Sequence, residues 1–351
     1  MGHIYNGVEL WQSGMVRPIL FLASALVCFA AAPCSKPDAS CTERVPLGTE
    51  GKYGLAYRSH ALRTPDSKIE RMLIVIHGAG RNADDYFASG EAGAFLAQAL
   101  ETTLVVSPRF GSNTGTCKDT LAEGEISWGC GGTTDWRGGG TAVGVNSFVF
   151  IEQLMRFAND KKIFPNMREI VVSGHSAGGQ FVHRFAAAAR VENEISVPVR
   201  YVVSNPSTYL YLDATRLAAS ATCSQDGKCT GAFANYSEGR NCTTFNQWRN
   251  GFEKRWGYAE SIPEEEMKQN LIKRNVTYLL GELDTQPIFG FDGTCPAMAQ
   301  GANRLTRGVT YWNYIKSKFN AGHKLVVVPA CGHNGRCIYT ADAARPVLFG
   351  K

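Results

Sequence analysis

The sequence is poor in charged residues and has no strong charge of one sign. Only 19% of its 351 residues are charged, and 36 Lys and Arg against 31 Asp and Glu leave a formal net charge of +5. No block of five or six like charges occurs, so no nucleic-acid partner is expected. The 44% share of hydrophobic residues, without any simple repeat, excludes a disordered, collagen-like or coiled-coil chain.

Long apolar runs are also lacking, except near the N-terminus. Residues 18–32 read PILFLASALVCFAAA, fifteen uncharged residues that follow Arg17 and end in an A-x-A pattern. This run is shorter than the roughly 20 residues of a membrane-spanning helix and is typical of a secretory signal peptide. We therefore expect residues 1–32 to be a signal peptide, with Met15 as a possible true start. Residues 33–351 would form one secreted or periplasmic domain without a membrane span.

The cysteine content agrees with export. Of eleven cysteines, Cys28 lies in the predicted signal peptide, and ten remain. An even number of cysteines in an exported chain indicates disulfide bonds. Three pairs enclose short loops and are expected to bond, and two more follow only by elimination. The three pairs that enclose short loops are Cys117–Cys130, Cys223–Cys229 and Cys331–Cys337. The two pairs assigned by elimination are Cys34–Cys41 and Cys242–Cys295.

Short runs rich in β-branched residues alternate with helical patterns along most of the chain. Several of these runs are continuously apolar, as expected for strands buried on both faces of a parallel sheet. This order predicts an α/β fold with a doubly wound, mostly parallel sheet. The strand-like runs are 55–62, 72–78, 103–109, 169–176, 199–207, 276–284 and 323–330, and the helical patterns are about 84–100, 145–161, 177–191 and 302–321.

Two segments interrupt this alternation. Residues 110–144 follow a strand-like run and carry Trp128 and Trp136 among several glycines. Loops after parallel strands gather at the sheet edge where ligands bind, so we expect both tryptophans to shape a substrate pocket. Residues 213–270 are rich in aromatic residues and hold three cysteines. They are expected to form a disulfide-stapled, cap-like insertion over the site, with an ordinary surface insertion as the alternative.

The five residues from Gly174 to Gly178, GHSAG, are the strongest indication of chemistry. They lie between a strand-like run and an Ala-rich helical pattern, and the glycines permit a strained turn that exposes the Ser176 hydroxyl. His175 is expected to point away from Ser176. A glycine-rich turn with an idle serine is the alternative. Because a serine hydroxyl becomes nucleophilic only when a base removes its proton, a histidine and a carboxylate are expected downstream.

His333 is the one histidine of seven that lies where such a base belongs. It follows the last strand-like run, in the loop CGHNGRC that a Cys331–Cys337 disulfide would hold rigid. A zinc site formed by these residues would need a second pair of cysteine ligands, so no metal is expected.

Three aspartates are candidates for the carboxylate that orients His333. Asp284 lies at the end of the penultimate strand-like run. If Asp284 is the carboxylate, the three residues occur along the chain in the order Ser, Asp, His. Asp213 and Asp292 are the alternatives. An ionised aspartate beside the imidazole would hold the tautomer that presents a free nitrogen to Ser176.

Hydrolysis of an acyl group also needs hydrogen-bond donors for the negative oxygen of the tetrahedral intermediate. The main-chain N–H of Ala79, in the turn HGAG, is one candidate, and that of Ala177, at the start of a helical pattern, is the other. Gly80 would replace Ala79 if the turn were shifted by one residue. The alternative is that HGAG forms only a tight turn.

Four motifs in this order resemble those of the α/β-hydrolase superfamily: HGAG at 77–80, GHSAG at 174–178, GELD at 281–284 and GHN at 332–334. The resemblance covers about residues 50–340. The short HG-x-G loop and the cysteines make the chain similar to feruloyl esterases and polyhydroxyalkanoate depolymerases. This resemblance implies serine-dependent ester hydrolysis without a cofactor.

The leading hypothesis is therefore a secreted serine hydrolase that cleaves small-molecule or polymeric carboxylic esters through an acyl-enzyme. A serine peptidase or lipase using the same three residues is one alternative. The other is a non-catalytic binding module derived from hydrolases. Such modules commonly lose one of the three residues, whereas all of them are present in this sequence.

Overall fold

The computed structural model describes residues 1–3, 7, 33–48, 50–236, 241–288 and 290–350. The chain divides into two units, residues 1–31 and residues 32–351. The predicted signal peptide lies almost wholly outside the described residues. Within the described ranges, no helix is both long and apolar enough to span a membrane.

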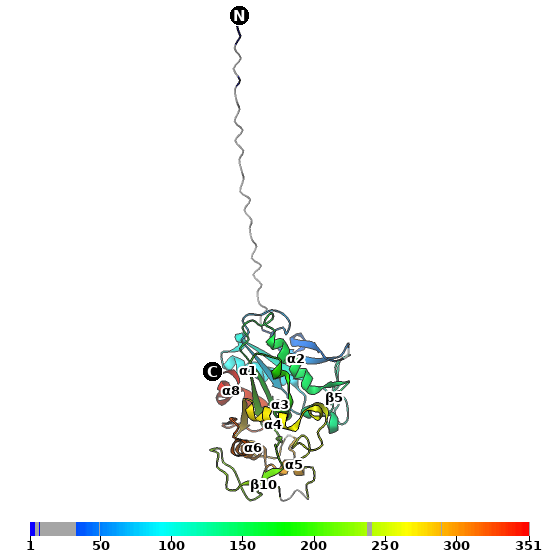
Figure 1. The fold of residues 1–351 in the computed structure, drawn as a ribbon, viewed down its shortest axis with the longest axis vertical. Coiled ribbons are helices and arrows are strands. Elements are labelled where there is room, and N and C mark those ends of the chain that lie inside the picture. Colours follow the sequence, from blue (N-terminus) through cyan, green and yellow to red (C-terminus); the bar gives the residue numbers. More distant parts are fainter. Residues whose placement is uncertain (4–6, 8–32, 49, 237–240, 289, 351) are drawn as a thin grey trace. The chain divides into compact units, whose positions relative to one another are not determined.

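A mostly parallel, eight-stranded sheet runs through the second unit (Figure 1). Its strand order is β1-β2-β4-β3-β7-β8-β11-β12, in which β2 is antiparallel to both of its neighbours and every other pair is parallel. The strands are β1 (Thr42–Pro46), β2 (Tyr53–Arg58), β3 (Arg71–Ile76), β4 (Thr103–Arg109), β7 (Glu169–His175), β8 (Val199–Ser204), β11 (Val276–Gly281) and β12 (Lys324–Val328). Two short antiparallel pairs join β5 (Thr141–Ala142) to β6 (Val145–Asn146) and β9 (Thr215–Leu217) to β10 (Phe233–Asn235).

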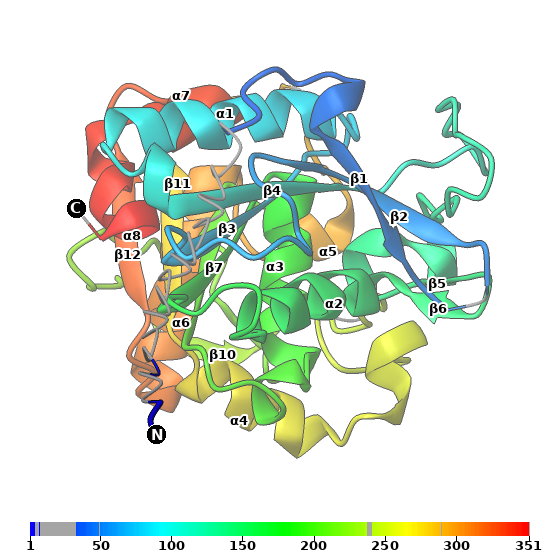
Figure 2. The same ribbon diagram turned by 90° about the horizontal axis from the view of Figure 1, so that it is seen from above.

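Helices cover both faces of this sheet. They are α1 (Ala83–Leu96), α2 (Ser147–Asn159), α3 (Ala177–Ala188), α4 (Glu264–Lys273), α5 (Cys295–Met298), α6 (Arg304–Phe319), α7 (Gly335–Thr340) and α8 (Arg345–Phe349). Figure 2 shows α1 and α7 on one side of the sheet and α2, α3 and α4 on the other. Because successive strand residues point to opposite faces, Leu73 and Val75 of β3 pack in the core under α1, whereas Met72 and Ile74 pack in the core under α2 and α3.

The predicted fold class is confirmed, since each of the seven strand-like runs overlaps a strand and each of the four helical patterns overlaps a helix. The apolar stripe of α2 is buried as its spacing requires, including Phe148, Ile151 and Leu154. Several short elements, among them β1, α7 and α8, have no counterpart in the sequence prediction. They have six residues or fewer, which is too short for a clear hydrophobic period.

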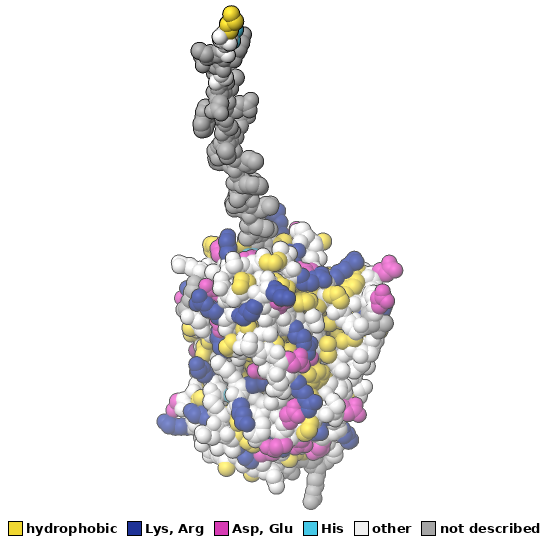
Figure 3. All heavy atoms as spheres, turned by 45° about the horizontal axis from the view of Figure 1, so that its top comes forward, with side chains coloured by type: hydrophobic (Ala, Val, Ile, Leu, Met, Phe, Trp, Pro, Cys, Tyr) yellow, Lys and Arg dark blue, Asp and Glu magenta, His cyan; other side chains and the backbone are white. Residues whose placement is uncertain are grey.

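All five predicted cysteine pairs are disulfide-bonded. Cys223–Cys229 lies inside the insertion that separates β8 from β11, and Cys242–Cys295 joins the insertion to α5. Each bond restricts the unfolded chain, the more so when it closes a long loop. On the face that Figure 3 shows, basic and acidic side chains are interspersed, as the small net charge leads one to expect.

Glu91 of α1 is a buried carboxyl group. Its side chain is 7% exposed, and its Oε1 atom has no hydrogen-bond partner among the described residues. Burial raises the pKa of Glu91 from 4.5 to about 7. Because the folded protein holds this proton more tightly than the unfolded chain, the resulting stability is fully present below pH 4.5 and is lost as the pH rises through about 7.

We expect Glu91→Gln to raise the free energy of unfolding by about 2 kcal/mol at pH 8, where the wild-type carboxylate is ionised in a buried position. The gain should disappear at pH 4, where Glu91 is protonated in both states. Urea denaturation at the two pH values measures the difference. Glu101→Gln, at an exposed position, serves as the control. An equal gain at both pH values would contradict the assignment of the effect to this proton.

Candidate active site

Ser176 occupies a strained turn between β7 and α3, with φ 57° and ψ −117°. A positive φ is uncommon for a residue with a side chain and has to be held by its surroundings. The neighbouring glycines make this possible, because the chain passes too close to other backbone atoms for any side chain. A Cβ atom would lie 2.3 Å from the Gly178 oxygen if placed on Gly174, and 2.2 Å from the Ile76 oxygen if placed on Gly178.

A chain of hydrogen bonds joins Ser176 to His333 and Asp284. The Ser176 Oγ atom lies 3.0 Å from His333 Nε2, and His333 Nδ1 lies 2.8 Å from Asp284 Oδ2. Ser176 follows β7, Asp284 follows β11 and His333 follows β12. These parallel strands end at one edge of the sheet, which is why residues so distant in sequence meet there.

Asp284 is almost fully buried and is surrounded by hydrogen-bond donors. Besides His333, Nδ2 of Asn205 donates to its Oδ2 atom at 2.6 Å, and Nη1 of Arg304 lies 3.4 Å from its Oδ1 atom. Burial alone would favour the neutral acid, but the hydrogen bond and charge of His333, the Asn205 hydrogen bond and the Arg304 charge together lower the pKa of Asp284. An ionised carboxylate can accept a hydrogen bond from Nδ1, and in that arrangement Nε2 is the atom that accepts from the Ser176 hydroxyl.

The roles of Asn205 and Arg304 were not predicted from the sequence. Asn205 directly follows β8, and its Oδ1 atom also accepts a hydrogen bond from the Gly281 N–H at the end of β11. Its position after a parallel strand was the one available signal. Arg304 begins α6 and is 1% exposed, and nothing in its local sequence distinguishes it from a surface arginine.

The turn HGAG is held by His77, which is fully buried. His77 Nδ1 lies 2.8 Å from the Gly78 oxygen, and the Phe110 N–H donates to Nε2 at 2.9 Å. Nε2 is therefore the acceptor and Nδ1 carries the proton. Burial lowers the pKa of His77 to about 4, which keeps the ring neutral and this arrangement unchanged at neutral pH.

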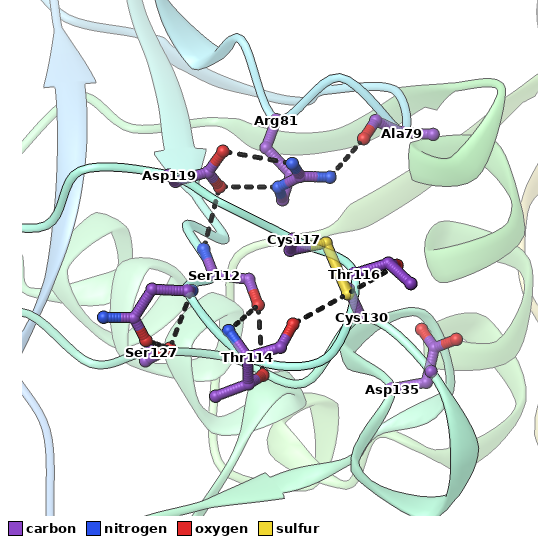
Figure 4. The surroundings of a disulfide bond; sticks show 12 residues. Ala79, Arg81, Ser112, Thr114, Thr116, Cys117, Asp119, Ser127, Cys130 and Asp135 are labelled. Carbon is purple, nitrogen blue, oxygen red and sulfur yellow. Dashed lines mark hydrogen bonds and ion pairs between the residues drawn. A yellow bond between two sulfur atoms is a disulfide. The ribbon is translucent and has the colours of Figure 1, made fainter.

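Arg81 and Asp119 brace the same turn from the side of the long loop after β4 (Figure 4). Arg81 Nη1 donates to the Ala79 oxygen at 2.6 Å, and Nε and Nη2 donate to the two oxygens of Asp119 at 2.5 and 3.0 Å. Asp119 lies within the loop that the Cys117–Cys130 disulfide closes. The carbonyl side of the Ala79–Gly80 peptide is thus tied to a cross-linked loop.

Ser176, His333 and the HGAG turn line one cavity of about 580 Å³. Residues from the first turns of α1 and from 334–336 form other parts of its wall. Ala79 is exposed to the cavity, and Ala177 is the first residue of α3, whose N–H therefore has no acceptor within the helix. One cavity is thus lined by Ser176 as the candidate nucleophile, by His333 as the candidate base and by the turn that carries the Ala79 N–H.

Trp128 and Trp136 do not line this cavity, contrary to expectation. They are 0% and 2% exposed and belong to the hydrophobic core under α2 and α3. The Trp136 ring is stacked on Phe110, with ring centroids 4.9 Å apart. Large indole rings gain most from complete burial, and here the loop after β4 folds inward to provide it.

His175 also differs from expectation, since it lines the same cavity as Ser176. Its ring centroid lies 4.7 Å from that of His333, and its Nδ1 atom lies 2.8 Å from the Tyr86 hydroxyl. Burial, together with the nearby His333, lowers the pKa of His175 well below its ordinary value. His175 is therefore a neutral ring that packs against the base candidate.

Cys331 and Cys337 form a disulfide, so neither can supply a thiolate to a metal beside His333. Among the described residues, no cluster of three or more His, Cys, Asp or Glu side chains is arranged to hold a metal ion. The other two aspartate candidates lie elsewhere. Asp213 pairs with Lys318, and Asp292 accepts hydrogen bonds from Thr294.

The sequence matches no protein-family model and no curated protein. Solved structures do resemble the fold. Poly(aspartic acid) hydrolase-1 from Sphingomonas sp. KT-1 is 22% identical, with a TM-score of 0.57 over 88% of this chain and 98% of that one. The poly(3-hydroxybutyrate) depolymerase LpqC from Bordetella parapertussis is 17% identical, with a TM-score of 0.57 over 86% of this chain and 85% of that one. Together with the strand order and the turn at Ser176, these similarities identify the fold of this chain as that of the α/β-hydrolases.

Proposed function

We propose that this protein is an exported serine hydrolase that cleaves carboxylic esters through an acyl-enzyme. The observation that carries the proposal is the hydrogen-bond chain from Ser176 through His333 to Asp284, inside a cavity large enough for a small acyl group. A non-catalytic module would have no need to keep a buried aspartate ionised behind an imidazole that faces a strained serine.

In the first half of the reaction, the Ser176 oxygen attacks the carbonyl carbon of the ester while His333 Nε2 takes the hydroxyl proton. Asp284 stabilises the imidazolium that forms and holds its orientation. When the tetrahedral intermediate collapses, the bond to the alcohol oxygen breaks and His333 returns the proton to that oxygen. The alcohol leaves, and the acyl group remains on Ser176.

In the second half, water takes the place of the alcohol. His333 Nε2 removes a proton from the water as its oxygen attacks the acyl carbon, and then returns that proton to the Ser176 oxygen. The acid is released and the enzyme is restored. No cofactor takes part in these steps.

The negative oxygen of both intermediates would be stabilised by the main-chain N–H groups of Ala79 and Ala177. The N–H of Ala177 lies at the positive end of the α3 dipole, where negative charge is favoured. Arg81, which pairs with Asp119, holds the main-chain oxygen of Ala79, so the turn that carries the Ala79 N–H is fixed before the substrate arrives.

Arg81→Met is expected to lower kcat for an activated ester about tenfold, with little change in KM, because only the transition state needs the fixed donor. Steady-state kinetics with p-nitrophenyl butyrate measures both constants. Arg168→Met, which removes a surface ion pair with Glu70, is the matched control and should leave kcat unchanged. An unchanged kcat in Arg81→Met would show that the brace does not support catalysis.

Export is supported by the five disulfides, because such bonds persist in oxidising compartments. The apolar run at 18–32 is the proposed signal peptide, and the mature protein would be secreted or periplasmic. N-terminal sequencing of the protein recovered from culture medium or periplasm tests this proposal. Recovery of the intact chain from the cytoplasm alone would contradict it.

Ester hydrolysis has to be separated from peptidase or lipase activity on the same residues. The names of the two structural neighbours specify different polymers, poly(aspartic acid) and poly(3-hydroxybutyrate). The fold alone therefore does not determine which kind of bond is hydrolysed. Short-chain and long-chain p-nitrophenyl esters, a polyester film and a peptide amide distinguish these activities. We expect turnover of the short-chain esters at rates well above that of the amide.

Labelling with a fluorophosphonate probe tests the proposal directly. The wild-type protein should be labelled, because the probe reacts only with an activated serine, whereas Ser176→Ala should not. Absence of labelling in the folded wild-type protein would contradict the catalytic proposal without affecting the fold assignment. It would favour the alternative of a non-catalytic binding module.

A further inference from the structure

A second cavity, of about 350 Å³, lies where the insertion meets the loop after β4 and the first turns of α3. Three arginines, Arg137, Arg184 and Arg249, line it. Thr244 and Thr294 are exposed and belong to the same lining, which places them at its mouth. We refer to it below as the arginine cavity.

Arg184 is the unusual member of this set. It is 1% exposed. Within the described part of the chain, its guanidinium donates only to neutral acceptors: the main-chain oxygens of Arg249 and Arg137, the Gln180 side chain and the Thr208 hydroxyl. No ion pair of Arg184 occurs among the described residues. Burial, followed by the charges of Arg249 and Arg137, lowers the pKa of Arg184 well below its ordinary value. A buried cation without a carboxylate partner is costly, and a bound anion would offset that cost.

The two other arginines are already neutralised in part. Asp135, which is fully buried, pairs with Arg137 at 2.5 Å and with Arg249 at 2.8 Å. Asp135 lies behind these arginines, whereas Asp292 is in the lining itself and accepts hydrogen bonds from Thr294. Three guanidinium groups against two carboxylates leave one positive charge, which a single monoanion would balance.

The arginine cavity is close to the proposed catalytic serine. Gln180 and Arg184 lie four and eight residues after Ser176, which corresponds to about 6 and 12 Å along the axis of α3. The segment around residues 290–292 also contributes to both cavities, through Gly290 on one side and Asp292 on the other. A ligand group in the arginine cavity would therefore lie beside the cavity that Ser176 and His333 line.

We propose that the arginine cavity binds a carboxylate group, carried either by the substrate or by a free acid such as the released product. Guanidinium and hydroxyl donors are suited to the two oxygens of a carboxylate. Its single negative charge would balance the one positive charge that remains when Asp135 and Asp292 are counted against the three arginines. Binding of a carboxylate carried by the substrate presupposes the proposed ester hydrolysis, whereas binding of a free acid does not.

The experiment needs a variant that changes the charge of the cavity without disturbing its walls. Arg184→Gln would remove the cation, but it would also remove the hydrogen bonds that hold the main chain at Arg137 and Arg249. Thr244→Glu instead adds a negative charge at the exposed mouth. Thr244→Gln, which has nearly the same size and no charge, is the matched control, and thermal denaturation verifies that both variants fold.

Isothermal titration calorimetry measures the binding of butyrate, with neutral butyramide as the comparison ligand, in the Ser176→Ala background. We expect butyrate to bind and butyramide to bind at least about tenfold more weakly, because the excess charge acts only on the anion. Thr244→Glu should weaken butyrate binding about tenfold, and Thr244→Gln less than about twofold. Absence of butyrate binding, or equal weakening by both variants, would overturn the proposal.

Kinetics with two esters of equal chain length identifies the source of the carboxylate. If the substrate supplies it, Thr244→Glu should raise KM for mono-p-nitrophenyl glutarate about tenfold and leave KM for p-nitrophenyl pentanoate unchanged. If both KM values are unchanged while butyrate still binds, a free acid is the ligand. If neither ester is hydrolysed, the proposed function fails, but the calorimetry still decides whether this site exists.

Discussion

Ser176→Ala is expected to lower kcat/KM for p-nitrophenyl butyrate by at least about 10⁴-fold, because the side chain that forms the acyl-enzyme is lost. The remaining acceleration over water would come from binding and from the Ala79 and Ala177 donors. Thermal denaturation should show little change, since the substitution removes only a hydroxyl group that faces the cavity and retains the glycines of the turn.

Ser196→Ala is the control, because Ser196 is exposed, hydrogen-bonds to Asn159 and does not line the cavity of Ser176. Its kcat/KM should equal that of the wild-type protein. A loss of less than about tenfold in Ser176→Ala would show that another group performs the attack, since serine hydrolases without their nucleophile lose far more.

Asp284→Asn is expected to lower kcat about 10⁴-fold, although the side chain keeps its size. An amide N–H facing Nδ1 of His333 would favour the tautomer that carries its proton on Nε2, and that nitrogen could no longer accept the Ser176 proton. The substitution also removes the charge of Asp284 from beside the buried Arg304, so we expect a loss of about 3 kcal/mol in the free energy of unfolding.

Steady-state kinetics and urea denaturation separate these two effects. Asp213→Asn is the matched control, because Asp213 was a sequence candidate for the same role but pairs with Lys318 in the structure. Its kcat should stay within about twofold of the wild-type value. If Asp213→Asn lost as much activity as Asp284→Asn at similar stability, the proposed orientation of His333 by Asp284 would be wrong.

Much of the fold could be predicted because its signals are local. The buried strands of a parallel sheet appear as continuous apolar runs, and α2 shows its stripe at helical spacing. The short loops closed by Cys223–Cys229 and Cys331–Cys337 likewise bring their cysteines together by chain connectivity alone. The turn at Ser176 was recognisable from the glycines that its close backbone contacts require.

The surroundings of the site could not be predicted, because they depend on which elements meet in space. Arg304 reaches Asp284 only when α6 packs beside the end of β11, and Asn205 does so only because β8 and β11 are neighbours. The tryptophan prediction failed for the same reason. An aromatic residue in a glycine-rich loop can line a pocket or fill a core, and the sequence does not distinguish the two for Trp136.

The sequence by itself indicated the class of fold, the three disulfides that close short loops, and Ser176 and His333 as candidate catalytic residues, since each depends on residue type and spacing along the chain. Only the tertiary structure decided which of the three aspartates faces His333, which polar groups surround it, where the tryptophans lie, and that Arg184 is buried with no anionic partner among the described residues. Burial and charge compensation are sums over neighbours from distant segments, and those neighbours are defined only once the chain has folded.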